Sequence, residues 1–569
     1  MNKFIFKNKF FLGYISKVNA NRVVVHIPSS TYMTMFYHYG ERFHGGVINS
    51  YIVVEGESIG FIGKIVATEI PEKERLELSS KALKYKDIHP LCYVELLSIF
   101  DYQSVKFQKS VNEFPDIGAK VYMASEAFIN KYLIDIELNQ YSLKTDGFAK
   151  LVNSNLASTV DFSFQSLFSR HAAIIGTTGS GKSWTTSSLI HSLLENKQKV
   201  LLIDATGEYV NLANKYCNKD EKVIIGDTHI LPYEYLTIQD LFHLLTPAPN
   251  AQAPKLREAI RSLKLLDKYE DELIDYINES GGIKTIIKDG RERTPFLKIL
   301  NENVEKISTD DCDFDIRGLA IQVQNECIYP TGFNEDKFGN PDQTALGYCT
   351  SLITRIESLI NDDFYNNVFD FQQLQSDKDN LMENLETFIN GQTDKYLFYI
   401  NVSSVPTTFN MKEVVVDIIG QNILRKSRTN IFNNHPLTVF VDEAHQFLNR
   451  SITTEMDDKK LDAFESIAKE GRKYGLFLCL TTQLPRDIPI GILSQIGTFI
   501  THRLINQRDK DIIMHSLPVT NENVINYLPT LGQGEAIISS TEIKDVLYVK
   551  VNEPMIPPKS NTPKYSKEN

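Results

Sequence analysis

Gly176-Thr-Thr-Gly-Ser-Gly-Lys182-Ser183 is a complete G-x-x-x-x-G-K-S string, the pattern of a phosphate-binding loop, or P-loop. The apolar run 172–175 before it predicts a buried strand, and the apolar spacing of residues 187–194 after it predicts a helix. Backbone N–H groups of such a loop surround a phosphate, and the helix N-terminus adds partial positive charge. The sequence therefore predicts a nucleotide-phosphate site here.

Within this motif each residue has an expected role toward ATP and Mg²⁺. Lys182 would neutralise the β- and γ-phosphates, and the Ser183 hydroxyl would bind Mg²⁺. The residues predicted to contact the nucleotide are Gly176, Thr177, Thr178, Gly179, Ser180, Gly181, Lys182, Ser183 and Trp184.

A second motif, Leu437-Thr-Val-Phe-Val-Asp442-Glu443, is an apolar strand that ends in two carboxylates, which is the Walker B form. Asp442 would bind Mg²⁺ directly or through a water, and Glu443 would act as the general base that activates water. The next predicted strand ends at Gln483, whose amide could hydrogen-bond the γ-phosphate or the attacking water. These residues predict hydrolysis rather than binding alone.

Composition limits the class of protein. The chain has 569 residues, 42% of them hydrophobic, which favours a folded protein of several domains. It holds no apolar stretch of about 18 residues, so no membrane span or membrane partner is expected. Six scattered cysteines without a C-x-x-C pair favour reduced thiols and a cytoplasmic location. The net charge of −12 excludes a uniformly basic DNA-binding surface but allows a local basic channel.

The strand and helix patterns predict an α/β protein with a mainly parallel sheet. Short β-branched runs in the first segment predict a small β-barrel or sandwich, and helical periodicity interrupts the α/β pattern further on. The expected segments are 1–150, a β-barrel; 151–245, the first part of the ATPase core; 246–394, a helical insertion; 395–551, the second part of the core; and 552–569, an extended tail.

Six strings carry a resemblance to the HerA family of hexameric DNA-translocating ATPases. In chain order they are the P-loop, Asp204-Ala-Thr-Gly-Glu208-Tyr209, Asp442-Glu443-Ala-His445, Glu470-Gly-Arg472-Lys473-Tyr-Gly475, Thr482-Gln-Leu-Pro485 and Leu531-Gly-Gln-Gly-Glu-Ala536. They cover the α/β core, about 160–245 and 395–550. The family's pattern has arginine where this chain has leucine in Thr482-Gln-Leu-Pro485, so any contact made by that arginine is in doubt.

The resemblance implies a RecA-like P-loop core with an N-terminal HAS-barrel and a homo-hexameric ring that moves DNA through its pore. It also implies a partner, either a nuclease or an NAD-consuming effector of antiviral defence. By the same resemblance, Arg472 matches an arginine that acts in trans on a neighbour's ATP, and Arg170 matches a second arginine at the nucleotide site. Asp204 and Glu208 match a turn that shapes the region near the phosphates.

Other classes of protein fit less well. An ABC-type ATPase needs a signature loop shortly before Walker B, and the similar string Glu279-Ser-Gly-Gly-Ile283 comes far too early. Conjugation motors share the core but usually carry a membrane anchor. A scaffold ring, which binds ATP to assemble and activate an effector with little movement along DNA, stays open. Arg450, Lys459 and Lys460 fit a solvated loop better than a pore loop.

Overall fold

The structure of the protein is a computed structural model. Contacts between residues divide the chain into two compact units. The first unit contains Met1–Lys197, Thr481–Arg486 and Leu493–Pro557, and the second contains Gln198–Leu480, Asp487–Ile492 and Pro558–Asn569. The structure describes residues 6–20, 22–71, 88–108, 111–136, 143–152, 159–332, 336–373, 377–448, 461–518, 522–543 and 545–559. The predicted residues Arg450, Lys459 and Lys460 lie outside these ranges.

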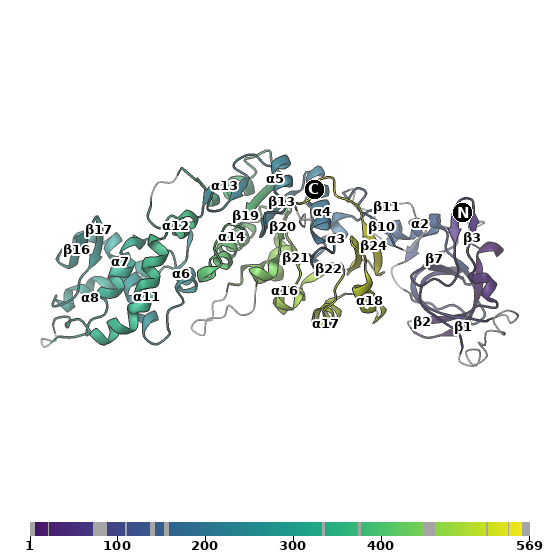
Figure 1. The fold of residues 1–569 in the computed structure, drawn as a ribbon, viewed down its shortest axis with the longest axis horizontal. Coiled ribbons are helices and arrows are strands. Elements are labelled where there is room, and N and C mark those ends of the chain that lie inside the picture. Colours follow the sequence, from purple (N-terminus) through teal and green to yellow (C-terminus); the bar gives the residue numbers. More distant parts are fainter. Residues whose placement is uncertain are drawn as a thin grey trace, which may run out of the picture. The chain divides into compact units, whose positions relative to one another are not determined.

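A closed β-barrel begins the first unit (Figure 1). Its strands in spatial order are β2 (Arg22–His26), β1 (Phe11–Val18), β9 (Lys120–Met123), β5 (Tyr51–Glu55), β6 (Ile59–Glu69) and β7 (Leu91–Asp101), and β7 pairs back with β2. β8 (Phe107–Gln108) extends β7, β3 (Phe36–His38) pairs with β4 (Glu41–Phe43), and α2 is Glu126–Ile136. Alternating apolar side chains fill the interior, as the β-branched runs predict.

The rest of the first unit contributes strands and helices of the α/β core. Its strands, in spatial order, are β11 (Thr159–Val160), β10 (Ala149–Leu151), β24 (Leu547–Val551), β23 (Glu535–Ser540), β22 (Ile496–Thr501) and β12 (His171–Ile175). β12 and β22 are parallel, and the pairs from β22 outward are antiparallel. The helices are α3 (Phe164–Leu167), α4 (Lys182–Glu195), α17 (Gln507–Ser516) and α18 (Glu522–Tyr527).

The barrel is joined to strand β24 by a buried ion pair. The Lys64 ammonium lies 3.0 Å from the Asp545 carboxylate and donates to the Val546 carbonyl at 2.7 Å. Tyr51 donates its hydroxyl to the other Asp545 oxygen at 2.5 Å. Burial, and then the Asp545 charge, raise the pKa of Tyr51 well above its usual value, so Tyr51 remains a donor. Each charge in this contact has a partner, which buried charges require.

We expect Asp545→Asn to destabilise the first unit by about 3–5 kcal/mol, because it leaves the Lys64 charge buried without its partner. Scanning calorimetry would measure this as a lower midpoint for that unit. The control is Lys131→Ala, which removes the more exposed Lys131–Asp135 pair of α2 and should cost less than about 1 kcal/mol. Equal midpoints for Asp545→Asn and wild type would contradict this role of the pair.

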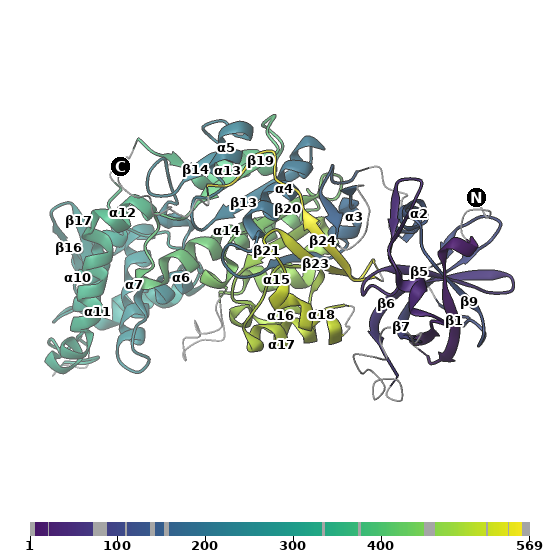
Figure 2. The ribbon, with the colours of Figure 1, turned by 45° about the vertical axis from the view of Figure 1, so that its right-hand side comes forward.

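The second unit holds the parallel part of the core (Figure 2). Its strand order is β21 (Leu476–Thr482, residues up to Leu480 in this unit), β20 (Leu437–Val441), β13 (Lys199–Asp204), β19 (Leu397–Asn401) and β14 (Lys222–Ile224). All neighbouring pairs are parallel. These strands are almost wholly apolar and buried, as strands covered on both faces must be. The helices include α5 (Val210–Tyr216), α6 (Ile238–Leu245), α14 (Met411–Ser427) and α15 (Ala463–Glu470).

The insertion is mainly helical, and it also contains a hairpin that the sequence reading missed. Its elements are α7 (Gln252–Lys268), β16 (Ile277–Ser280), β17 (Ile283–Ile286), α8 (Arg293–Glu302), α9 (Val304–Ile307), α10 (Leu319–Asn325), α11 (Gln343–Asn361), α12 (Asp363–Phe369) and α13 (Leu381–Ile389). None of the described helices combines the length and apolar composition needed to cross a bilayer.

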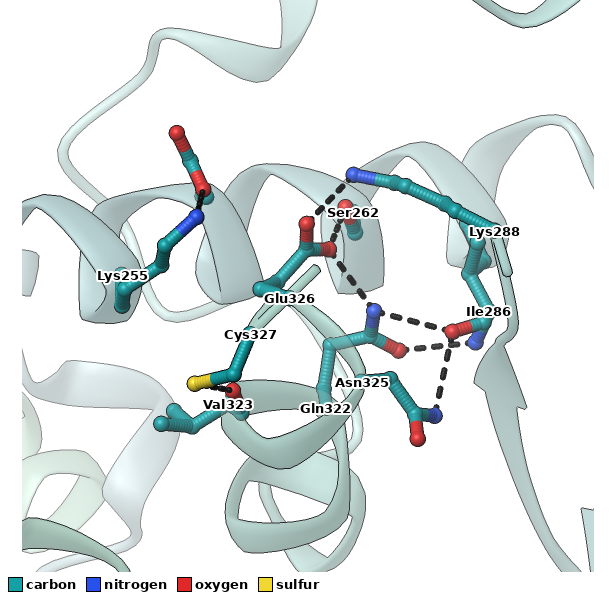
Figure 3. A network of polar contacts seen from close by, with 10 residues as sticks. Lys255, Ser262, Ile286, Lys288, Gln322, Val323, Asn325, Glu326 and Cys327 are labelled. Carbon is teal, nitrogen blue, oxygen red and sulfur yellow. Dashed lines mark hydrogen bonds and ion pairs between the residues drawn. The ribbon is translucent and has the colours of Figure 1, made fainter. Parts of the chain in front are cut away.

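A buried polar network ties the helices of the insertion to this hairpin (Figure 3). Glu326 accepts from Lys288 at 2.6 Å, from Ser262 at 2.6 Å and from Gln322 at 2.8 Å. Gln322 also bonds both the N–H and the carbonyl of Ile286. Glu326 is 3% exposed, and its charge is compensated by these three donors. The network therefore serves the insertion's own packing.

Candidate active site

The P-loop lies between β12 and α4, which begins at Lys182. Gly179 and Gly181 have φ values of +71° and +119°, conformations that favour glycine. Such backbone directs successive N–H groups toward one point, which is the geometry of an anion site. Lys182 is 7% exposed, and its Nζ donates to the Thr177 carbonyl of the loop at 3.3 Å. Ser183 and Trp184 lie half-buried in the first turn of the helix.

Two threonines of the loop form hydrogen bonds with residues that follow the ends of β21 and β22. The Thr177 N–H donates to the Arg503 carbonyl at 2.9 Å. The Thr178 hydroxyl donates to the Gln483 side-chain oxygen at 2.6 Å. The structure thus brings the predicted Gln483 into contact with the P-loop. A change in the loop on losing a phosphate would reach this glutamine directly.

The Walker B carboxylates follow β20 in the second unit. Asp442 and Glu443 are 6% and 8% exposed. Glu443 has a φ of +44°, which is uncommon for a residue with a side chain, and such strain often marks functional positions. Its Oε2 lies 3.3 Å from Nδ1 of His445. The strand end therefore holds two buried carboxylates in a fixed orientation.

Asp204 orders the turn that follows β13. Its carboxylate accepts from the N–H groups of Thr206, Gly207 and Tyr209 at 3.1, 2.7 and 2.9 Å, and from the Tyr399 hydroxyl at 2.9 Å. Tyr209 in turn donates its hydroxyl to Asp442 at 3.3 Å. Asp204, at 0% exposure, thus acts through this turn on the Walker B aspartate. These bonds give Asp204 a structural role in the turn, while its relation to bound phosphates stays a prediction of the resemblance.

Arg472 lies at the opposite end of the sheet from the Walker B carboxylates of its own chain. It precedes β21, which is parallel to β20 and aligned with it from Leu437 with Leu476 to Val441 with Leu480. Asp442 follows the far end of β20. Five strand residues span about 17 Å, more than an arginine side chain covers. The Arg472 side chain is exposed.

Arg170 has the same relation to the P-loop. It precedes β12, and the P-loop follows the other end of that strand, again about 17 Å away. Its side chain is exposed and passes over Gly497, where an added Cβ would lie 2.7 Å from the Arg170 Cβ. Arg170 therefore cannot reach the P-loop of its own chain.

The described part of the tail follows the core of the same chain. The Ile556 carbonyl accepts from Ser187 of α4 at 2.5 Å, and the sulfur of Met555 lies 3.2 Å from His191. Farther along, the Lys559 N–H donates to the Glu208 carbonyl at 2.8 Å. The extended conformation agrees with the proline-rich composition of this segment.

Two sets of site residues were missed in the sequence. Tyr399, which bonds Asp204, comes from a distant position that no spacing pattern marks, and the bond of Tyr209 to Asp442 was not expected although Tyr209 belongs to a quoted string. The second set is His502, Thr185 and Gly534. The Thr185 hydroxyl bonds His502, and the Gly534 N–H bonds the Ser180 carbonyl of the P-loop. The available signal was a histidine directly after an apolar strand and a Gly-Gln-Gly string, but neither indicates its partner.

Comparisons with known proteins agree with this geometry. The family model for the central domain of helicase HerA matches residues 149–385, and that for the HerA-like C-terminal region matches residues 432–569. A probable helicase of Methanocaldococcus jannaschii is 26% identical over 454 residues, which are 74% of this chain and 75% of the relative. The DNA double-strand break repair helicase HerA of Saccharolobus solfataricus is 25% identical over 396 residues, 68% of this chain and 64% of the relative.

Solved structures give a fold-level likeness. The bacterial conjugative coupling protein TrwB is 11% identical, with a TM-score of 0.43, over 77% of this chain and 93% of that one. VirB4 of Thermoanaerobacter pseudethanolicus is 13% identical, with a TM-score of 0.39, over 67% and 89%. The two family models cover both parts of the core, with the P-loop and Walker B in their expected order. The chain belongs to the HerA family of P-loop ATPases.

Proposed function

We propose that this protein is a ring-forming, ATP-dependent DNA translocase. The observation that carries the proposal is the P-loop bonded to Gln483, in a chain whose central and C-terminal parts both match HerA models. The relative from Methanocaldococcus jannaschii is named as a probable helicase, and the one from Saccharolobus solfataricus as a helicase of DNA double-strand break repair, which supports DNA as the substrate. The net charge of −12 restricts DNA contact to a local surface such as a pore.

In this proposal each residue of the P-loop has a defined task. Backbone N–H groups of residues 176–181 surround the phosphates, and Lys182 exchanges its bond to the Thr177 carbonyl for a bond to phosphate. The Ser183 hydroxyl and the Asp442 carboxylate are hard oxygen ligands of the kind that Mg²⁺ prefers, so the donor set fits that ion. Mg²⁺ would neutralise charge that develops on the phosphate oxygens.

Glu443 takes the proton of the attacking water in the same proposal. Its low exposure and fixed backbone favour one orientation of the carboxylate. Gln483 would sense the γ-phosphate through its bond to Thr178, because a loop that moves on hydrolysis pulls on that amide. Both tasks match what other P-loop ATPases require of a base and a water-orienting amide.

We further propose that the ring is a hexamer in which Arg472 completes the neighbour's site. The support is geometric, since Arg472 stands about 17 Å along the strand from its own Walker B carboxylates. An arginine supplied in trans stabilises charge on the transferring phosphoryl group. Head-to-tail contacts that close produce such rings. Sedimentation velocity with ATP and Mg²⁺ at micromolar protein tests the assembly, and a stable monomer would contradict it.

Arg472→Ala should lower ATP turnover about 10³-fold without dispersing the ring, the scale lost with a trans arginine. Because Lys182 and Arg472 would serve one site from two subunits, rings that mix Arg472→Ala with Lys182→Ala subunits should regain activity above either variant alone. The matched control is Arg425→Ala, an exposed arginine of α14, which should turn over normally. Normal turnover by assembled Arg472→Ala rings would exclude the role and leave Arg170 as the candidate.

The function itself is tested by adding DNA. A translocase should hydrolyse ATP faster with duplex or single-stranded DNA and should displace a third strand from a triplex. ATPase activity that DNA leaves unchanged, together with ATP-dependent assembly of a partner enzyme, would instead support the scaffold ring. The resemblance to HerA proteins also supports a nuclease or NAD-consuming partner in antiviral defence. Co-purification from the native operon, followed by assay for nuclease and NAD hydrolysis, would test that part.

A further inference from the structure

His502 is buried directly behind the P-loop. It follows β22 at 0% exposure, and its backbone N–H donates to the carbonyl of Ile175, the last residue of β12, at 2.7 Å. Its ring Nδ1 lies 2.9 Å from the Glu535 carbonyl, and Nε2 lies 2.9 Å from the Thr185 hydroxyl. Because a carbonyl only accepts, Nδ1 carries the hydrogen and Nε2 accepts from Thr185. The ring thus links the first turns of α4 to the turn before β23.

Burial keeps this imidazole neutral. Loss of solvent lowers the pKa of His502 to about 4, and the Lys182 charge acts in the same direction. The Glu535 carbonyl acts the other way, but more weakly than burial. At neutral pH the ring therefore retains one donor and one acceptor, which is the state that both hydrogen bonds need.

The ring also fills the space behind the loop. A Cβ added at Gly176 would lie 2.7 Å from the His502 Cβ, and one added at Gly181 would lie 3.3 Å from its Cε1. At Gly181 the added atom would also lie 2.9 Å from the Gly534 Cα. The two glycines that bound the loop therefore allow the histidine and the 531–535 turn to approach closely.

That turn holds the P-loop directly. The Gly534 N–H donates to the Ser180 carbonyl at 2.8 Å. Gly532 donates its N–H to the Glu535 side chain at 2.7 Å, which closes the turn on itself. The position of the turn therefore fixes one carbonyl of the loop, and the His502–Glu535 bond fixes the turn.

We propose that His502 is a positioning residue for the P-loop: it keeps α4 and the 531–535 turn at one separation, so that the loop retains its phosphate-binding shape. The residue acts through Thr185, Gly181 and the turn. The inference rests on nucleotide binding at this loop. If His502 served only the packing of the core, its substitution would lower the stability of the fold and leave the affinity for nucleotide unchanged.

The test uses the full-length protein and fluorescent ADP as the probe. Thr185→Val keeps the side-chain volume and removes the hydroxyl, while His502→Asn keeps a donor toward Glu535 and loses the acceptor toward Thr185. We expect each variant to bind ADP about 3- to 10-fold more weakly, the scale of one neutral hydrogen bond. Thr185→Val also removes the longer contact of the hydroxyl with the Gly181 carbonyl, at 3.2 Å, whereas His502→Asn leaves that contact in place. The double variant should be no weaker than the worse single one, because all three lose the Thr185–His502 bond.

The matched control is Thr186→Val. Thr186 is as buried as Thr185, and its hydroxyl bonds only within α4, to the Lys182 carbonyl at 3.0 Å. Its ADP affinity should stay within about 2-fold of wild type, since an intrahelical bond does not reach the turn. Thermal midpoints without nucleotide, measured for all variants, separate loss of stability from loss of affinity.

Three results would overturn the inference. They are an unchanged ADP affinity in Thr185→Val despite a lower midpoint, effects of the two single variants that multiply in the double variant, and equal loss of affinity in Thr186→Val. Failure of wild type to bind ADP would overturn the ATPase function itself, and the positioning role with it. Equal binding by wild type and Thr185→Val overturns only the positioning role.

Discussion

Lys182→Ala should lose ATP hydrolysis by at least about 10³-fold and should bind nucleotide far more weakly. Lys182 provides the positive charge at the loop, and its ammonium already bonds the loop carbonyl of Thr177 at 3.3 Å. Alanine leaves the phosphates with backbone donors alone. Steady-state phosphate release and fluorescent-ADP titration would measure both effects.

The control for this variant is Lys215→Ala, an exposed lysine of α5 in the same core. It removes the same charge from the chain and should leave turnover unchanged. The thermal midpoint of Lys182→Ala without nucleotide should be close to that of wild type. Wild-type turnover in Lys182→Ala would remove the P-loop from the reaction and with it the central functional conclusion.

Glu443→Gln should bind ATP normally and hydrolyse it at least about 10²-fold more slowly, the scale lost with a general base. Glutamine keeps the shape and the hydrogen-bonding reach but does not accept the proton of water. The strained backbone at φ +44° stays the same, so folding should be little affected. Single-turnover hydrolysis and retention of labelled ATP on the protein would separate binding from chemistry.

Glu383→Gln is the matched control, because Glu383 is an exposed glutamate of α13 in the same unit. Its turnover should equal that of wild type. If Glu443→Gln hydrolyses ATP at the normal rate, another residue orients the water, and the buried strand-end carboxylate serves structure or metal binding instead.

The core could be predicted closely because buried parallel strands are continuous apolar runs. Strands β13 (Lys199–Asp204) and β21 (Leu476–Thr482) are runs of this kind. The barrel strand β7 is harder to recognise, since Glu95 interrupts its apolar pattern. The β16–β17 hairpin was recognisable: Gly281 and Gly282 both have positive φ between two short strands, which is the usual two-residue turn. The string Glu279-Ser-Gly-Gly-Ile283 therefore forms a hairpin turn, and its likeness to an ABC signature has no structural counterpart here.

The candidate site shows a similar division. The P-loop and Walker B are local strings, so spacing alone reveals them. The separation of Arg472 from Asp442 was also within reach of the sequence, because Arg472 precedes one parallel strand and Asp442 follows the next, which places them at opposite ends of the sheet. The bonds of Tyr399 to Asp204 and of Gly534 to Ser180 join residues far apart in the chain. Such pairs depend on how the strands are ordered, and no local pattern encodes that order.

Because the buried Lys64–Asp545 pair attaches the barrel to β24, the barrel is a suitable place for a label in experiments that follow movement of the first unit. Asp545 leads into β24, where Val551 donates to the Gly534 carbonyl, and Gly534 donates to Ser180 of the P-loop. All the residues in this succession of contacts belong to the described part of the first unit. A fluorophore or a surface tether placed on the barrel would therefore report the movement of the unit that contains the P-loop. Single-molecule recordings could then assign each observed step to the nucleotide-binding body itself.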